Sequence, residues 1–150
     1  MKIRHEVSDE EEIVIRTSAD KEKVSALKRA IEEALLGSDE IILSLGDREC
    51  FVKKSDILFF ESADGKVFAH TEDAVYRAPY KLFELESVMP QSFTRVSKSA
   101  IVNIMRIGYL KRELVGNGEI GFFGCDKKVY FSRGYYKLLE YKTNEMRLLK

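Results

Sequence analysis

Lysine and arginine are distributed very unevenly along this chain of 150 residues, although 25 basic side chains balance 25 acidic ones overall. From Met1 to Thr94 there are 13 Lys and Arg against 20 Asp and Glu, a net charge of −7. From Arg95 to Lys150 there are 12 against 5, a net charge of +7. This asymmetry suggests that one face of the protein meets a polyanion, since Lys and Arg bind phosphate oxygens. A basic surface that is merely solvated is the alternative, and charge alone does not separate the two.

Residues that usually carry out catalysis or hold metals do not cluster in this sequence. Cys50, Cys125, His5 and His70 are scattered, whereas a metal site takes three or four such ligands at short spacings. Gly116-Asn117-Gly118 lacks the Lys-Ser/Thr of a phosphate-binding loop and indicates a hairpin turn instead. No nucleophile elbow or pair of catalytic carboxylates is evident. We therefore expect no enzyme activity, no metal, no cofactor and no small-molecule substrate.

Four segments follow one another in an order that carries a family resemblance. The most specific runs from Phe93 to Asn103, where an aromatic residue, an Arg and an apolar residue precede Ser-Lys-Ser and an apolar-Val-Asn ending. In chain order the four are Asp56–Ser62, Lys81–Glu86, Phe93–Asn103 and Val129–Tyr136. In these segments the chain resembles the LytTR family of bacterial DNA-binding domains, from about Glu40 to Met146.

This resemblance implies a fold and a function. The fold would consist of small antiparallel sheets stacked with short helices, and its loops would enter successive major grooves of double-stranded promoter DNA. The family commonly binds paired direct repeats, as the output domain of a response regulator, and a homodimer is possible. A receiver domain does not fit within Met1 to Asp39. We therefore expect a stand-alone transcription regulator, controlled by its N-terminal part, its abundance or a partner.

The resemblance also implies which residues contact DNA, on loops at Ala63–Lys66, Val96–Ser99 and Ser132–Tyr136. Arg can donate two hydrogen bonds to guanine O6 and N7, Lys can serve a base or a phosphate, and Ser can donate to phosphate. The expected DNA-binding residues are Lys66, Arg95, Ser97, Lys98, Ser99, Arg106, Ser132 and Arg133. Three alternatives remain open: Arg95 simply solvated, Arg106 capping a short segment, and Asn103 in a structural role.

The segment before Glu40 is predicted to be an appendage of strands and one helix. Short strands are predicted at Lys2–Val7 and Ile13–Thr17, around an acidic turn. Apolar residues at three-and-four spacing then predict an amphipathic helix from Asp20 to Leu36, and Gly37 supplies its stop. We accordingly divide the chain into residues 1–38, for support, dimerisation or regulation, and residues 39–150.

The remainder is predicted to be mainly β, with short strands separated by turns. A helix with apolar residues at Leu82, Leu85 and Val88 interrupts the strands, and a closing helix follows Ser132 as its N-cap. The predicted strands are Glu40–Leu45, Glu49–Lys53, Ile57–Ser62, Val67–Thr71, Ala74–Ala78, Phe93–Val96, Ile107–Lys111, Glu119–Phe123 and Lys128–Phe131.

No secretion signal and no membrane span are evident in the sequence, so we expect a cytoplasmic protein. A second functional reading is a protein-interaction module or regulatory subunit that uses its acidic N-terminal half. The positions of three side chains distinguish a DNA-binding protein from a protein-interaction module. Lys66, Lys98 and Arg133 should lie on one face of a DNA-binding protein and on separate faces of the alternative.

Overall fold

The computed structural model describes residues 20–35 and 39–148. The predicted strands at Lys2–Val7 and Ile13–Thr17 lie outside the described residues, as does the predicted stop at Gly37. Helix α1 (Lys21–Leu35) confirms the predicted amphipathic helix and packs against α2 (Leu82–Val88). Part of that contact is the Arg29 guanidinium, 6.0 Å from the centre of the Tyr80 ring. No helix within the described residues is long and apolar enough to cross a membrane.

Seven strands form the larger sheet, in the order β2-β1-β5-β4-β3-β7-β6 with every neighbouring pair antiparallel. Tight turns join most of them. The β3–β4 turn is Asp64-Gly65, a pair of residues typical of tight hairpin turns, and both residues have positive φ. The strands are β1 (Glu40–Leu45), β2 (Arg48–Lys53), β3 (Phe59–Ala63), β4 (Lys66–His70), β5 (Val75–Ala78), β6 (Phe93–Ser97) and β7 (Ala100–Asn103).

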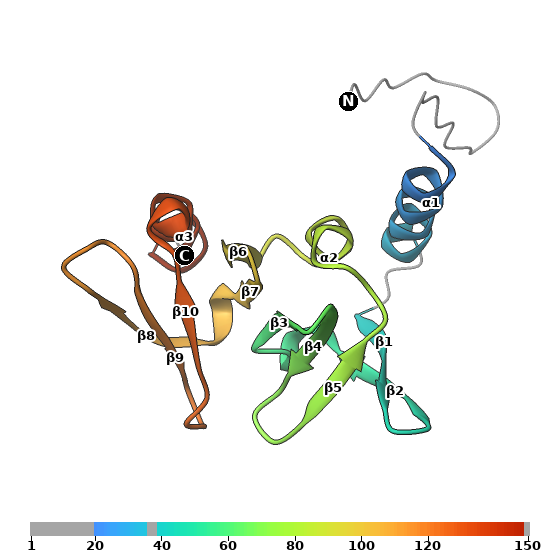
Figure 1. Ribbon diagram of the computed structural model, residues 1–150, viewed down its shortest axis with the longest axis horizontal. Helices are drawn as coiled ribbons and strands as arrows, with labels where there is room; N and C mark the ends of the chain where they lie inside the picture. The colour runs from blue at the N-terminus through green and yellow to red at the C-terminus, as the bar shows by residue number, and fades with distance from the viewer. Residues whose placement is uncertain (1–19, 36–38, 149–150) are drawn as a thin grey trace.

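Three more strands form a separate antiparallel sheet in the order β10-β9-β8. They are β8 (Ile107–Arg112), β9 (Gly118–Phe122) and β10 (Lys128–Phe131). Figure 1 shows this sheet at the left, with helix α3 (Tyr136–Thr143) above it, while α2 lies above the larger sheet at the right. The mainly antiparallel β architecture predicted from the sequence is therefore confirmed.

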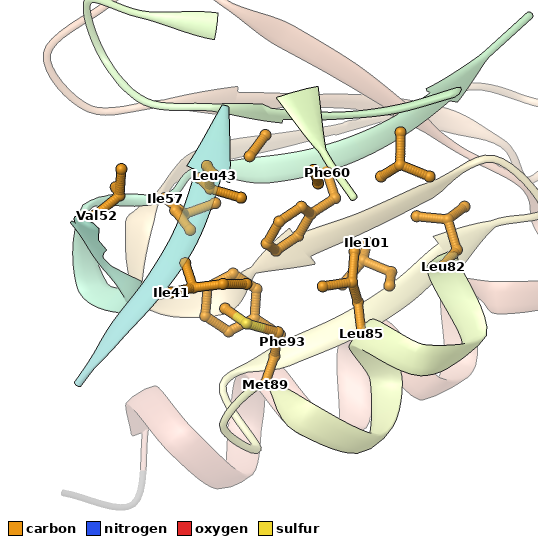
Figure 2. Close-up of a cluster of buried hydrophobic side chains, with 13 residues drawn as sticks. Ile41, Leu43, Val52, Ile57, Phe60, Leu82, Leu85, Met89, Phe93 and Ile101 are labelled. Atoms are coloured by element: carbon orange, nitrogen blue, oxygen red, sulfur yellow. The ribbon is translucent and has the colours of Figure 1, made fainter. Parts of the chain in front are cut away.

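One hydrophobic core lies between α2 and the larger sheet (Figure 2). Its centre is Phe60 on β3, which is fully buried with its ring 5.9 Å from that of Phe93 on β6. The apolar stripe of α2 contributes Leu82 and Leu85, and Ile101 reaches the same cluster from β7. The alternation along these strands directs every second side chain to this layer.

A second hydrophobic core lies between the other face of β3, β6 and β7 and the smaller sheet, and α3 closes it through Leu139. Phe59, the neighbour of Phe60 in sequence, belongs to this core, and Val102 joins it from β7. The ring of Phe59 stacks on Phe122 of β9, with centroids 5.3 Å apart. Strand β7 and the first two residues of β3 are therefore buried on both faces, and both strands contribute to both cores.

Apart from shifts of one or two residues at the ends of elements, the predicted elements differ from the structure in two places. Strand β7 was not predicted, because Ala100–Asn103 is a continuous buried run without the polar alternation of a half-exposed strand. The prediction that Ser132 caps the closing helix is wrong: its side chain makes no cap hydrogen bond, and a 3₁₀ turn, η3 (Arg133–Tyr135), precedes α3. Similar 3₁₀ turns, η1 (Lys54–Asp56) and η2 (Ile104–Arg106), lead into the β3 segment and into β8.

Candidate nucleic-acid interface

The turn between β6 and β7 is held in place by its own strand. A β-bulge at Val96 lets Ser97 pair with Ala100, so that only Lys98 and Ser99 form the turn. Arg95 braces this turn, since its Nε donates to the Ser97 carbonyl at 2.8 Å and its guanidinium also donates to the Lys98 carbonyl. Glu86 lies 3.4 Å from the same guanidinium. Arg95 is thus a positioning residue within the protein.

The side chain of Ser97 orders the same turn. Its Oγ accepts a hydrogen bond from the Ser99 backbone N–H at 3.2 Å and lies 3.4 Å from the Ser99 Oγ. Lys98, between them, is exposed. The turn therefore presents the ammonium group of Lys98 and the hydroxyl of Ser99 on a backbone that Arg95 and Ser97 fix.

Two backbone hydrogen bonds bring the other predicted loops next to this turn. The Ser62 N–H, at the end of β3, donates to the Ser99 carbonyl at 2.8 Å, which places the β3–β4 hairpin turn (residues 63–66) on one side. The Ser132 N–H, just after β10, donates to the Val96 carbonyl at 2.8 Å and places Arg133 on the other side. The three loops predicted to contact DNA are therefore neighbours in space.

A shallow groove of about 520 Å³ opens between two of these loops, the β6–β7 turn and the segment after β10. Four of the predicted residues line it, together with residues from the β8–β9 connection and from β10. Its lining is Ser97, Ser99, Val115, Asn117, Tyr130, Phe131, Ser132 and Arg133. Ser132 and Arg133 are exposed, so their side chains are available to a ligand in the groove.

The β8–β9 connection supports Arg133 directly. Gly116 has a φ of +96°, and a Cβ added there would lie 2.9 Å from Cγ of Arg133, so the arginine stem packs on the glycine backbone. At the end of β8, the Arg112 guanidinium lies 4.3 Å from the centre of the Tyr136 ring, and this ring stacks on Phe131. Arg133 thus lines the groove, whereas Arg112 covers the Tyr136 ring, and the rings of Tyr136 and Phe131 pack in the second core.

The predicted DNA-binding residues are not all brought together. Lys98, Ser99, Ser132 and Arg133 surround or adjoin the groove, and Lys66 lies on the neighbouring hairpin. Arg106 lies elsewhere: it precedes β8 at the end opposite the β8–β9 connection, and its guanidinium is 2.5 Å from Glu72 Oε1. Six residues of strand separate those two ends, about 20 Å at about 3.3 Å per residue.

The charge on this surface is available to a ligand. Within residues 20–35 and 39–148, no ion pair engages Lys66, Lys98 or Arg133, and all three are exposed. Lys128 on β10 is different, because the Glu119 carboxylate 3.6 Å away raises the pKa of this lysine and keeps it protonated. The same carboxylate accepts a hydrogen bond from the Tyr109 hydroxyl and raises the pKa of that tyrosine.

The chemistry available here is hydrogen-bond donation and positive charge. In the described part of the chain, no three His, Cys, Asp or Glu side chains are grouped so as to hold a metal ion. Such a donor-rich surface suits phosphates and the acceptor edges of bases.

Sequence reasoning missed four groove residues, Val115, Asn117, Tyr130 and Phe131. The Asn117-Gly118 turn signal located the β8–β9 hairpin but carried no information about what lies beside its tip. Tyr130 was recognisable as an outward-facing residue of β10, because exposed Lys128 and Tyr130 alternate with buried Val129 and Phe131. Their contact with the groove depends on how the two sheets pack, which no local pattern encodes.

Comparison with known proteins agrees with this architecture. Residues 47–144 match the family model described as LytTr DNA-binding domain. A solved LytTr DNA-binding domain from Bacillus cereus is similar, with a TM-score of 0.66 at 23% identity over 71% of this chain and 97% of that one. At this identity the likeness shows the fold.

Relatives in Staphylococcus aureus are similar over a comparable length. An uncharacterized HTH-type transcriptional regulator of strain NCTC 8325 is 31% identical over 121 residues, 79% of this chain and 80% of that protein. Another so named, from strain N315, is 36% identical over 90 residues, 59% of this chain and 60% of that protein. Strands separate α1, α2 and α3 of this chain, so its described part has no helix-turn-helix. From the matched residues and the shared fold, the chain belongs to the LytTR family of DNA-binding domains.

Proposed function

We propose that this protein regulates transcription by binding specific double-stranded DNA with the loops around the groove. The observation that carries the proposal is the juxtaposition of three loops, at residues 63–66, 96–99 and 132–136, with exposed and unpaired basic side chains. Membership of a family of DNA-binding domains supports the same function, and the relatives named as transcriptional regulators support a role in transcription.

The side chains divide into two roles. Arg133 is the best base reader, because its stem is fixed on Gly116 while its guanidinium is free to donate two hydrogen bonds to guanine O6 and N7. Lys98 supplies a point charge to a phosphate, and the Ser99 and Ser132 hydroxyls donate to neighbouring phosphates. Arg95 and Ser97 act through the turn that they hold, and Lys66 extends the basic surface along the DNA.

The geometry favours the major groove. A B-DNA major groove is about 12 Å wide, which admits elements as wide as an α-helix or a two-stranded β-ribbon. The two-residue turn at Lys98 and Ser99 and the single 3₁₀ turn at Arg133 are both narrow enough to enter. Two copies on direct repeats would place equivalent loops in successive major grooves, at spacings close to whole helical turns.

The test is a titration of the full chain with labelled duplex DNA from upstream of its own gene, followed by fluorescence anisotropy at several salt concentrations. Affinity should fall steeply as salt rises, since bound Lys and Arg release counterions from DNA. Lys98→Ala should lower the slope of log affinity against log salt by about one unit. Arg133→Ala should cost about 1–3 kcal/mol on the preferred duplex and reduce its advantage over a scrambled one.

Arg106→Ala is the matched control, because it removes the same charge from the far end of β8. It should leave both the affinity and the salt slope close to those of the unaltered protein. Equal losses for Arg106→Ala and Arg133→Ala would contradict the proposed surface. Salt-independent binding, or no binding to any duplex tested, would contradict DNA binding itself and favour the protein-interaction reading.

A further inference from the structure

The tip of the β8–β9 hairpin exposes two apolar side chains beside the groove. Leu114 is fully exposed and is the most exposed large apolar residue within the described ranges. The neighbouring Val115 is 70% exposed. Figure 1 shows the hairpin projecting at the left, away from both cores. Neither side chain belongs to either hydrophobic cluster. Their exposure therefore contributes nothing to the stability of the fold.

The tip is nevertheless a well-defined structure. The Glu113 N–H donates to the Asn117 carbonyl at 2.8 Å, and the Gly116 N–H donates to the Glu113 carbonyl at 3.1 Å, so the turn closes on itself. Gly116 packs on the stem of Arg133, which ties the tip to the third loop. Leu114 and Val115 are thus held in a fixed position relative to the guanidinium of Arg133.

The tip carries one exposed carboxylate, Glu113, and its other surroundings are basic and polar. Lys111 and Arg112 precede Glu113 on β8, and Val115 lines the same groove as Ser99 and Arg133. A polyanion drawn to these side chains would therefore lie against Leu114 and Val115 as well. In the major groove of DNA the one apolar group on a base edge is the 5-methyl of thymine.

We infer that Leu114 and Val115 read thymine, by packing against its 5-methyl group on base pairs next to the one that Arg133 contacts. This inference rests on the proposed function and adds a second kind of readout to it. Arg133 selects by hydrogen bonds, and the hairpin tip selects by apolar contact. The protein should then prefer sites in which thymines adjoin the guanine.

The test begins with selection of a preferred duplex from a random library by the full chain. Each thymine of that duplex is then replaced in turn by deoxyuridine, which removes only the methyl group. One or two replacements should weaken binding about fourfold each, the effect expected for one buried methyl-sized group. In the double variant Leu114→Ser, Val115→Ser, the unmodified duplex should bind correspondingly more weakly, and the same replacements should have no further effect.

Val75→Ser is the matched control, because Val75 is also exposed but lies on β5 of the larger sheet. It should retain the full sensitivity to deoxyuridine. Equal sensitivity in the tip variant, or none in the unaltered protein, would overturn the inference while leaving the proposed DNA binding intact. A change in sedimentation of the DNA-free protein on altering the tip would also overturn it, since the tip would then be a contact between copies. Failure to enrich any duplex would overturn both proposals.

Discussion

Asn103 is a structural residue at the junction of the two sheets. It is buried, its Nδ2 donates to the Ile57 carbonyl at 3.0 Å, and its Oδ1 accepts from the Met105 N–H at 3.1 Å. Its own backbone N–H donates to the Leu58 carbonyl. The structural role was one of the alternatives that the sequence left open, and these hydrogen bonds confirm it.

Replacing Asn103 by Ala should lower the free energy of unfolding by about 1–3 kcal/mol, because the Ile57 carbonyl and the Met105 N–H would lose their partner in a buried site. Urea unfolding followed by circular dichroism measures this change. Asn103→Asp keeps an acceptor for Met105 but buries a carboxylate facing a carbonyl, and it should be destabilising too. Asn117→Ala, on the exposed hairpin, is the control and should change stability little; a comparable loss there would contradict this account.

At the residue scale, charge and motif pointed to loops that the structure brings together, but not to what each side chain does within them. Lys98 and Arg133 were predicted to bind DNA, and both are exposed beside the groove. Arg95 was predicted to contact DNA as well, yet its guanidinium lies against two loop carbonyls. That arrangement depends on the bulge at Val96, and a bulge leaves no clear mark in a sequence of this composition.

At the scale of elements, a stack of three rings joins the two sheets. His70 on β4 stacks on Phe59 of β3 with centroids 4.3 Å apart, and Phe59 stacks in turn on Phe122 of β9. The His70 Nε2 lies 2.8 Å from Glu61 Oε1, while its Nδ1 is buried without a hydrogen-bond partner in the described structure. Burial lowers the pKa of His70, the Glu61 carboxylate opposes this, and Lys127 reinforces it.

This stack makes the stability of the fold sensitive to acid. The pKa of His70 in the folded protein lies below its ordinary value of 6.5, so the unfolded chain binds the proton more readily. Stability should therefore be fully present above about pH 6.5 and should fall as the pH drops below that value toward the folded pKa. Urea midpoints at pH 7.5 and 5.5 measure the loss. His70→Gln should lose less between these two pH values, and an equal loss in both proteins would assign the effect to other groups.

The elements with one exposed face were the most predictable from sequence. Strands β1 and β10 have their predicted boundaries, and along both of them buried side chains alternate with exposed ones over most of their length. Strand β7 was missed for the opposite reason, since its four residues are all buried and show no alternation. The arrangement of the ten strands into two sheets was not predictable from these patterns, because it depends on which faces pack together.

At the scale of the whole molecule, the two hydrophobic cores are not independent. Adjacent side chains on β3, Phe59 and Phe60, belong to different cores, and on β7 Ile101 and Val102 do the same. Loss of packing on one face of these strands therefore removes the support for the other face. The protein should unfold as one cooperative unit, although its strands form two sheets.

Phe60→Ala tests this coupling, because it empties a fully buried position in the first core only. It should cost about 3–5 kcal/mol and shift the unfolding of both cores equally. Methyl resonances of Leu85 and Leu139 report separately on the first and second cores in a urea titration. The two should disappear at the same urea concentration in the unaltered and the variant protein. Separate midpoints would show that the cores unfold independently.

The brace that Arg95 provides also sets the hydrogen-bond polarity of the β6–β7 turn. Because the guanidinium engages the Ser97 and Lys98 carbonyls, the turn's main acceptors are already in use, while the Lys98 ammonium and the Ser99 hydroxyl can still donate. A surface of donors is complementary to the N7 and O6 of guanine and to phosphate, and it has little to offer the amino group of cytosine. In the proposed complex with DNA, this turn would therefore suit phosphate oxygens and the guanine side of a G·C pair better than the cytosine side, which would give the bound protein a direction along the DNA.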